Sequence, residues 1–295
     1  MKLSIAVITM NRASQLCDAL NSCFNCNLSK DTQFVIIDNN SSDNTENVVF
    51  DIFKENNYEY YYEKLPQNLG VGGGRNYAFS KAKGDFVYFL DDDAYIESTN
   101  SNFFYDAINI FESDNRIMTL TTQIYDLLWK DNRVSVEGPK INDNLYLCLR
   151  FCGGSHFLRK SFWNDDLPYF PNKYGLEEIL PSLTVYDKRG INVFKTDLLV
   201  IHNPKVNKWD PNTKVSKDIL MMEIANKLAM KKMIYPKAAS PLLYLTFLLR
   251  CLRAHMFSSV IQILKISKSI NKINVKRIKM ATIYHITKIF GFSVF

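Results

Sequence analysis

The first 93 residues alternate between short apolar runs and longer segments in which apolar residues recur at helical spacing. The runs at 3–9, 34–37, 58–62 and 86–90 are rich in β-branched and aromatic residues, so each predicts a strand. Between them we expect three helices: one through 16–23, one starting at Asp43 with Glu46 at capping-box spacing, and one at 75–81 after a flexible glycine loop at 70–74. This order predicts an α/β fold with a mostly parallel central sheet flanked by helices.

Three adjacent carboxylates, Asp91, Asp92 and Asp93, follow the fourth predicted strand directly. In an open α/β sheet, ligands bind beyond the carboxyl ends of the strands. Adjacent carboxylates repel one another unless a cation joins them, and Mg²⁺ and Mn²⁺ prefer carboxylate oxygens and often share coordination with phosphates. The motif therefore predicts a divalent-metal site beside a phosphate-bearing substrate. The alternative interpretation is a solvated acidic turn.

Two common nucleotide-binding loops are excluded by the glycine pattern. A Rossmann dinucleotide fold needs a glycine-rich turn directly after the first strand, where this chain has Met10-Asn11-Arg12. A P-loop is excluded because no GxxxxGK[ST] motif occurs. The glycines at 70–74 are either a simple flexible connection or a backbone that approaches a phosphate, with Arg75 adding charge at a helix start.

Charge is divided unevenly along the chain, whose formal net charge is +6. No Asp or Glu follows Glu223, whereas 13 Lys or Arg lie in 224–295; residues 1–223 hold the other 23 basic residues and all 30 acidic ones, a net charge of −7. Segments such as 241–253, 260–266 and 276–280 mix large aliphatic residues with Lys and Arg, which is typical of helices in a membrane interface. No run reaches the roughly 20 apolar residues that span a bilayer. We expect 236–295 to bind an anionic membrane surface; the alternative is a helical tail that packs on protein.

The expected compartment is the cytoplasm. The N-terminus runs straight into a strand pattern without a signal-peptide pattern, and six scattered cysteines favour a reducing compartment. Cys23-x-x-Cys26 and the pair Cys148 and Cys152 are interpreted as buried thiols rather than zinc or redox sites. With the basic tail, this predicts a cytoplasmic protein that is peripheral on the inner face of the cell membrane. Nucleic acid is not an expected partner, because the tail has little that could stack on bases.

Several segments together resemble a known family. Val7–Arg12, Ile37–Asp43, Asn68–Asn76 and Leu90–Asp93 follow one another at strand ends, as in the nucleotide-binding half of family 2 glycosyltransferases, which have the GT-A fold. The resemblance continues in Cys152–Trp163, in Tyr174–Leu180 with Arg189-Gly190, and in Val200–Pro204. It implies a GT-A domain at 1–215, with a nucleotide-binding half at 1–95 and an acceptor half at 96–215. A basic amphipathic helical region at 216–295 lies beyond it.

The resemblance also implies which residues bind the nucleotide. Thr9, Asn11 and Arg12 would line the base and ribose pocket, and Asp38 would hold the nucleobase. Arg75 would lie near the diphosphate, because an Arg fork suits phosphate oxygens. UDP is the default nucleotide, and thymidine or guanosine donors remain open.

The resemblance implies separate roles for the three carboxylates after the fourth strand. Asp91 would contact the ribose or the sugar, with Asp92 beside it. Asp93 would bind the metal, Mn²⁺ or Mg²⁺, and His202 would be a further metal or diphosphate contact. A structural histidine is the alternative for His202.

The implied reaction is glycosyl transfer with inversion at the anomeric carbon. The acceptor hydroxyl needs a general base within reach, for which Glu178 is the first candidate and Glu177 the second. The family often has Glu-Asp at this position, so Glu-Glu is a departure from its pattern. Two acids favoured by the dipole of a helix start are the structural alternative.

The acceptor is expected to be a saccharide or a lipid-linked saccharide, as in the assembly of a capsule or O-antigen. Stacking faces for a sugar were sought among the aromatic residues near the acceptor motifs, which are also candidates for the core: Phe162, Trp163, Tyr169, Phe170 and Trp209. Two other protein classes stay open. A sugar nucleotidyltransferase would need a glycine-rich basic motif after the first strand, and an inactive scaffold would use the tail as its working part. Formation of a homo-oligomer is also open.

Overall fold

The computed structural model describes residues 2–164, 166–171, 176–205, 217–270 and 273–295. The chain divides into two compact units, Met1–Val206 and Asn207–Phe295. The domain boundary predicted at 215/216 falls on residues outside the described ranges, so it stays a prediction.

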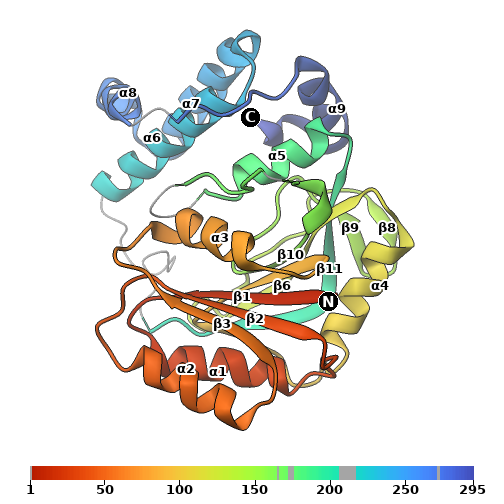
Figure 1. The fold of residues 1–295 in the computed structure, drawn as a ribbon. Coiled ribbons are helices and arrows are strands. Elements are labelled where there is room, and N and C mark those ends of the chain that lie inside the picture. The colour runs from red at the N-terminus through yellow and green to blue at the C-terminus, as the bar shows by residue number, and fades with distance from the viewer. Residues whose placement is uncertain (1, 165, 172–175, 206–216, 271–272) are drawn as a thin grey trace. The chain divides into compact units, whose positions relative to one another are not determined.

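The first unit is built on one mixed sheet, in which the described strands follow the order β3-β2-β1-β4-β10-β6-β11-β9-β8, with β5 paired to β11 and β7 paired to β6 (Figure 1). The strands are β1 (Leu3–Thr9), β2 (Thr32–Asp38), β3 (Glu59–Lys64), β4 (Phe86–Asp91), β5 (Ala94–Ile96), β6 (Ile117–Asp126), β7 (Asp131–Asn132), β8 (Lys140–Asn142), β9 (Leu145–Leu147), β10 (Ser155–Arg159) and β11 (Ile191–His202). The four predicted strands are parallel neighbours, as expected. The sequence did not predict that β10 would lie antiparallel between β4 and β6.

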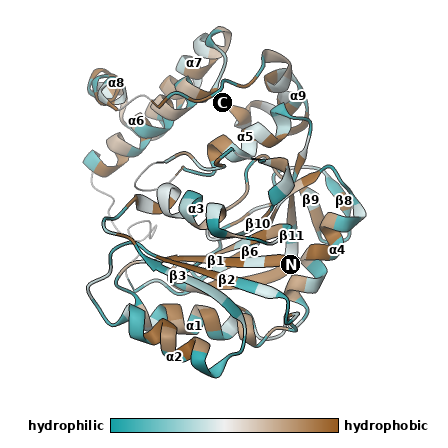
Figure 2. Ribbon diagram, in the orientation of Figure 1, coloured by the Kyte–Doolittle hydropathy of each residue, from teal (hydrophilic) through white to brown (hydrophobic). Residues whose placement is uncertain are grey.

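Helices cover both faces of this sheet because its central strands are apolar on both sides. Along β1, Ile5 and Val7 face a core that also holds residues of α1 (Ala13–Phe24), α2 (Thr45–Glu55) and α4 (Phe103–Ser113). Ala6 faces the opposite core, which includes residues of α3 (Gly70–Lys81) and α5 (Ile179–Asp187). Figure 1 shows α1 and α2 on one side of the central strands and α3 and α5 on the other, and the strands between them are among the most apolar parts of Figure 2. Strands buried on both faces are typical of α/β folds.

The start of α3 differs from the prediction. The helix begins at Gly70 rather than at Arg75, so the glycines form its first turns and not a loop. A Cβ on Gly74 would lie 2.8 Å from Cγ2 of Ile8. Because glycine has no side chain, α3 can approach β1 closely at this position. The Asn39 side chain supports this end by accepting from Leu69 N at 3.3 Å and donating to Gly70 O at 3.2 Å.

Two other predicted helix starts also need correction. The predicted capping box is not the start of α2, which begins at Thr45 after Asn44; the Asp43 carboxylate accepts from Thr45 N at 3.2 Å instead. The family resemblance of Cys152–Trp163 implies a small-residue strand followed by a helix, but after β10 the structure has only a short 3₁₀ turn, Lys160–Phe162. Side-chain hydrogen bonds of Asp with nearby backbone groups compete with regular helix starts, which accounts for the first difference.

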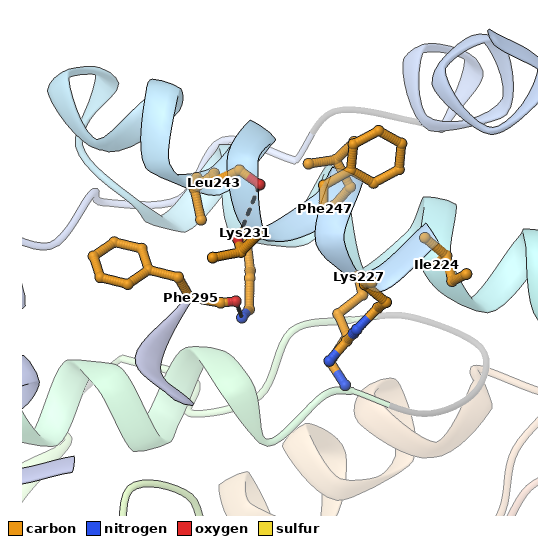
Figure 3. Close-up of a pocket in the computed structure, with 9 residues that line it drawn as sticks. Ile224, Lys227, Lys231, Leu243, Phe247 and Phe295 are labelled. Atoms are coloured by element: carbon orange, nitrogen blue, oxygen red, sulfur yellow. Dashed lines mark hydrogen bonds between the residues drawn. The ribbon is translucent and has the colours of Figure 1, made fainter. Parts of the chain in front are cut away.

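The second unit is helical, as predicted for the tail. Its helices are α6 (Lys217–Ile234), α7 (Ser240–Arg253), α8 (Val260–Ser269) and α9 (Met280–Phe290). Ile224, Leu228, Phe247, Cys251 and Ile263 meet in the core that joins α6, α7 and α8. Figure 3 shows a pocket of this unit where Lys231 reaches Phe295; the Lys231 Nζ donates to Phe295 O at 2.5 Å. Among the described helices, none is both long and apolar enough to cross a membrane.

Candidate functional site

The predicted site residues of β1, β2 and β4 meet at the carboxyl edge of the sheet. Thr9 pairs in register with Asp38, and Ile8 pairs with Asp91, so three neighbouring strands end together. The turn at Asp92 and Asp93 follows and leads into β5, which pairs with the end of β11. The sheet therefore brings residues that are far apart in sequence to one edge, where open α/β sheets bind their ligands.

Asp91, Asp93 and His202 form a cluster at this edge, with ligand atoms that all lie within 4.8 Å of one another. The His202 Nε2 is 3.3 Å from Asp93 Oδ1, and both side chains are buried, whereas Asp91 is partly exposed. Two carboxylates and an imidazole nitrogen are a donor set that suits Mn²⁺ and can hold Mg²⁺ through its oxygens. Buried carboxylates also need positive charge nearby. The residues present thus fit the divalent cation that the sequence predicts.

Arg12 lies against the acidic turn, and its role in the base and ribose pocket stays a prediction. Its Nη1 is 2.7 Å from Asp92 Oδ1 and 3.0 Å from Asp93 Oδ2. Burial raises the pKa of Asp92 to about 6, although the Arg12 charge acts in the opposite direction. Burial also opposes ionisation of Asp93, but hydrogen bonding to His202 and the charges of His202 and Arg12 outweigh it, so the pKa of Asp93 is lowered. Arg12 therefore holds the turn that presents Asp93 to the cluster.

Arg75 is buried and joins the cluster of Asp91, Asp93 and His202 to the predicted catalytic motif. Its Nη2 donates to Asp91 Oδ1 and to Gly153 O, both at 2.8 Å, and its Nη1 donates to Glu177 Oε1 at 2.5 Å. Burial would lower the pKa of Arg75, but the Asp91 and Glu177 carboxylates raise it. A Cβ on Gly153 would lie 2.8 Å from Arg75 Nη1. Glycine at this position therefore leaves room for the Arg75 guanidinium. The diphosphate role of Arg75 stays a prediction.

Glu177 and Glu178 precede α5 rather than lying inside its first turn, and Glu178 is the N-cap residue of this helix. Glu177 is buried, and its Oε2 has no hydrogen-bond partner among the described residues. Glu178 is partly exposed. Loss of hydration and the neighbouring Glu177 carboxylate raise the pKa of Glu178 to about 7. A carboxylate with a pKa near neutrality and access to solvent can accept a proton from a hydroxyl.

The end of the site that is predicted to bind the nucleobase is organised around Asp38 and Asn11. The buried Asp38 carboxylate accepts from Ser41 N at 2.6 Å and from the Tyr62 hydroxyl at 3.0 Å. Asn11, whose φ of 55° is in the left-handed region, accepts from Ser42 N at 2.7 Å through its side-chain oxygen. Thr9 is buried at the end of β1. Tyr62 was missed by the sequence reasoning, which interpreted it only as part of a strand.

The aromatic residues considered as sugar-stacking faces mostly belong to the core. Trp163, Tyr169 and Phe170 are each at most 3% exposed, so they are not open faces. Phe162 is partly exposed, and Trp209 lies outside the described residues. Tyr169 instead donates to or accepts from His156 Nε2 at 2.6 Å inside this core. Large aromatic side chains gain more from burial than from exposure, which is why the core interpretation holds.

Asp126 is a further residue at this edge that the sequence reasoning missed. It ends β6 and pairs in register with His202, the last residue of β11. Its Oδ2 is 2.8 Å from His202 Nδ1 and 3.6 Å from Arg133 Nε. Asp38 and Asp91 each follow an apolar run, whereas Asp126 follows Thr121-Thr122-Gln123-Ile124-Tyr125, so the local sequence carries only a weak signal for it.

The chain matches the family model described as "Glycosyl transferase family 2" over residues 4–166, more than half its length. The protein belongs to this family. The match confirms the resemblance carried by the strand-end motifs, and it includes the first four predicted strands and the acidic turn. Among the described residues with predicted roles, Glu177, Glu178 and His202 lie beyond the matched range.

Two curated relatives are glucosyltransferases by name. One is the Campylobacter jejuni GalNAc(5)-diNAcBac-PP-undecaprenol beta-1,3-glucosyltransferase, 38% identical over 31% of this chain and 29% of that protein. The other is the Bacillus spizizenii poly(ribitol-phosphate) beta-glucosyltransferase, 29% identical over 33% of this chain and 16% of that protein. This chain therefore matches less than a third of the length of either relative.

Solved structures with the same fold include known sugar-nucleotide complexes. S. aureus TarS in complex with UDP-GlcNAc has a TM-score of 0.59 at 22% identity, covering 77% of this chain and 66% of that one. The Pyrobaculum calidifontis mannosyltransferase PcManGT in complex with GDP-Man and Mn²⁺ has a TM-score of 0.63 at 13% identity, covering 97% and 79%. At these identities the likeness concerns the fold, which is the predicted GT-A fold.

Proposed function

We propose that this protein transfers a sugar, with inversion, from a nucleoside-diphosphate sugar to a saccharide or lipid-linked saccharide in cell-surface polysaccharide synthesis. The observation that carries the proposal is the convergence of the Asp91, Asp93 and His202 cluster with the Glu177-Glu178 motif through Arg75. A UDP-sugar is the first candidate donor, supported by the UDP-GlcNAc complex of TarS. The GDP-Man complex of the mannosyltransferase keeps a guanosine donor open.

In the proposed reaction the acceptor oxygen attacks the anomeric carbon and forms the new glycosidic bond. The bond from that carbon to the diphosphate oxygen breaks, and its electron pair leaves with the nucleoside diphosphate. The hydroxyl proton passes to the Glu178 carboxylate. We assign the base to Glu178 rather than Glu177, because Glu177 is buried and pairs with Arg75 at 2.5 Å. Glu178 is partly exposed and so can meet an incoming hydroxyl.

The remaining site residues prepare the donor. Thr9, Asn11 and Asp38 would bind the base and ribose, and Asp38 is held by Tyr62 for that purpose. Asp93, His202 and Asp91 would hold Mn²⁺ or Mg²⁺. When bound, such an ion supplies Lewis-acid stabilisation of charge on a departing diphosphate. Arg12 keeps Asp92 and Asp93 in place, and Arg75 orders Asp91 against Glu177.

The alternative function is an inactive GT-A-like scaffold that acts through its basic helical unit. The intact acidic cluster and the near-neutral pKa of Glu178 argue for catalysis instead, since perturbed carboxylates gather at functional sites. A scaffold would have no need of a partly exposed carboxylate whose ionisation is disfavoured.

Calorimetric titration separates the two functions. UDP, GDP and dTDP are titrated into the protein with Mn²⁺ and with EDTA, on wild type, Asp93→Ala and Asp143→Ala. Asp143 is the matched control because its side chain is 99% exposed on the loop after β8. We expect one nucleotide to bind in the presence of Mn²⁺, with affinity lost in EDTA and in Asp93→Ala but retained in Asp143→Ala. A folded wild-type protein that binds no nucleotide would rule out the donor site and favour the scaffold.

We further propose that the second unit attaches the protein to the cytoplasmic face of an anionic membrane. Helix α7 buries Leu243, Phe247 and Cys251 on one face. Leucines at helical spacing lie on its exposed side: Leu245, Leu248, Leu249 and Leu252, between 37% and 53% exposed. The surrounding sequence has Lys and Arg without any acidic residue after Glu223. Apolar area beside basic charge is the combination that interfacial helices use.

A further inference from the structure

We infer that Asp126 is a positioning residue that fixes the tautomer of His202 and so makes its Nε2 available to a divalent cation. The inference rests on the proposed metal site. It adds a residue to which neither the family motifs nor the comparisons give a role. The observation behind it is that the two carboxylate oxygens of the buried Asp126 have different hydrogen-bond partners.

The two carboxylate oxygens of Asp126 have separate hydrogen-bond partners. Oδ1 accepts from the backbone N–H groups of Leu128 and Trp129, both at 2.9 Å, and thereby caps the turn after β6. Oδ2 lies 2.8 Å from His202 Nδ1. Asp126 is fully buried, so its oxygens need these partners. With Oδ1 taken by two N–H donors, Oδ2 is the carboxylate oxygen that faces the ring and accepts, so the proton of the 2.8 Å contact lies on His202 Nδ1.

The other ring nitrogen of His202 faces the acidic cluster. Nε2 is 3.3 Å from Asp93 Oδ1, whereas the ring's Nδ1 side is taken by Asp126. A metal binds the nitrogen lone pair of a neutral imidazole, so Nε2 must be free of its proton when the ion is held. Each ring nitrogen faces a carboxylate, so the metal-free ring can carry both protons. The Nδ1 contact is the shorter one, 2.8 Å against 3.3 Å, so we expect the Nε2 proton to leave first, and the neutral ring then presents Nε2 to the cation. Carboxylate partners of this kind orient metal-binding histidines and typically change metal affinity about 10- to 100-fold.

The backbone contacts make Asp126→Asn a sharp test. In the variant, the amide oxygen should take the place of Oδ1, because the N–H groups of Leu128 and Trp129 both need an acceptor. The NH₂ group then faces His202 Nδ1 and donates to it. This switches the tautomer of His202. Nδ1 becomes the acceptor and the proton moves to Nε2, which can then no longer bind a cation. The fold should be retained, since the turn keeps both of its capping hydrogen bonds.

The first measurement is the tautomer of His202 in the metal-free protein, by ¹⁵N NMR of the imidazole rings. The chain has only four histidines, which keeps the spectrum simple, and His202→Gln assigns the signal. The spectra are recorded over a pH series up to the alkaline plateau, where the rings are neutral. We expect a protonated Nδ1 in wild type and a protonated Nε2 in Asp126→Asn. A wild-type ring that is protonated on Nε2 would overturn the inference.

The second measurement is Mn²⁺ affinity, by calorimetry and by the electron paramagnetic resonance signal of free Mn²⁺. We expect Asp126→Asn to weaken binding by about 10- to 100-fold without a change in melting temperature. Asp126→Ala removes the turn cap as well, so it should also lower the melting temperature. If Asp126→Asn switches the tautomer but binds Mn²⁺ as wild type does, Asp126 does not act on the metal, and the inference fails. If wild type binds no Mn²⁺ although its ring has the expected tautomer, the proposed metal site is wrong. The inference that Asp126 prepares His202 for a cation is then wrong as well.

Discussion

The environment of Glu178 is the feature of the site that bears most directly on its proposed catalytic role. The Glu178 carboxyl is partly withdrawn from water and lies beside the Glu177 carboxylate, and both effects raise its pKa to about 7. A raised pKa makes a carboxylate a stronger base, at the cost of being protonated over more of the neutral range. The pH dependence of turnover should therefore report this residue.

We expect transferase activity to rise with pH through about 7 and to level off above it. The sign follows from the role: only the ionised Glu178 can accept the hydroxyl proton, so activity is lost as pH falls through the pKa. Initial rates with saturating donor, measured from pH 5.5 to 9, check this. Glu178→Gln should lower kcat by about 10²- to 10⁴-fold. If Glu178→Gln keeps near wild-type rates while Glu177→Gln loses them, the assignment of the base is reversed.

Residues at strand ends could be predicted from the sequence because each follows an apolar run. Asp38 and Asp91 were found in this way, and the register of β1 with β2 and β4 brings them together. The partners of the buried Arg75 and His202 side chains could not be predicted. Arg75 meets Glu177 across 102 residues of chain, and Asp126 meets His202 across 76. Such contacts depend on where β10 and β11 enter the sheet, which no local pattern specifies.

At the scale of elements, periodicity located the first four strands to within a few residues, whereas helix starts were less well predicted. Glycine favours loops because it loses the most backbone freedom in a helix, and so 70–74 was expected to be a loop. In the fold this cost is outweighed by packing, since α3 can lie close to β1 only where side chains are absent. The position of Gly74 against Ile8 shows this tertiary effect overriding local propensity.

Gly74→Ala should destabilise the first unit. The new Cβ would lie 2.8 Å from Ile8 Cγ2 and 3.1 Å from Asn39 Nδ2, so α3 must shift away from β1. Overpacking costs about 1–3 kcal/mol, against a gain of about 1 kcal/mol in helix propensity. We therefore expect the free energy of unfolding, measured in urea, to fall by up to about 2 kcal/mol. Ser80→Ala, at an exposed position of the same helix, should change it by less than about 0.5 kcal/mol. Equal stability of the two variants would mean that α3 does not depend on this close approach.

Over the whole molecule, charge and function are divided between the two units. The candidate site lies in the first unit, within a region of net negative charge, and the second unit has the excess of Lys and Arg. A negative field around a site for a nucleoside diphosphate would repel the donor unless cations are supplied locally. Arg12, Arg75 and the proposed divalent ion would meet that need at the carboxyl edge. The basic charge of the second unit is therefore not required there, which is consistent with the membrane role proposed for it.

Binding to lipid vesicles tests the membrane role proposed for the second unit. The full chain should bind vesicles that contain phosphatidylglycerol and should not bind vesicles of pure phosphatidylcholine. The reason is that each Lys or Arg near an anionic surface contributes about 1 kcal/mol to binding. Leu245→Ser with Leu249→Ser removes apolar area from one exposed face of α7 and should weaken binding at least about tenfold. Ile141→Ser with Leu167→Ser is the matched control, since these residues are similarly exposed but lie in the first unit. Added salt should weaken binding as well, because it screens the charges. Equal binding by both double variants would remove α7 from the contact, and a wild-type chain that sediments without vesicles as a dimer would instead assign its leucines to a second copy.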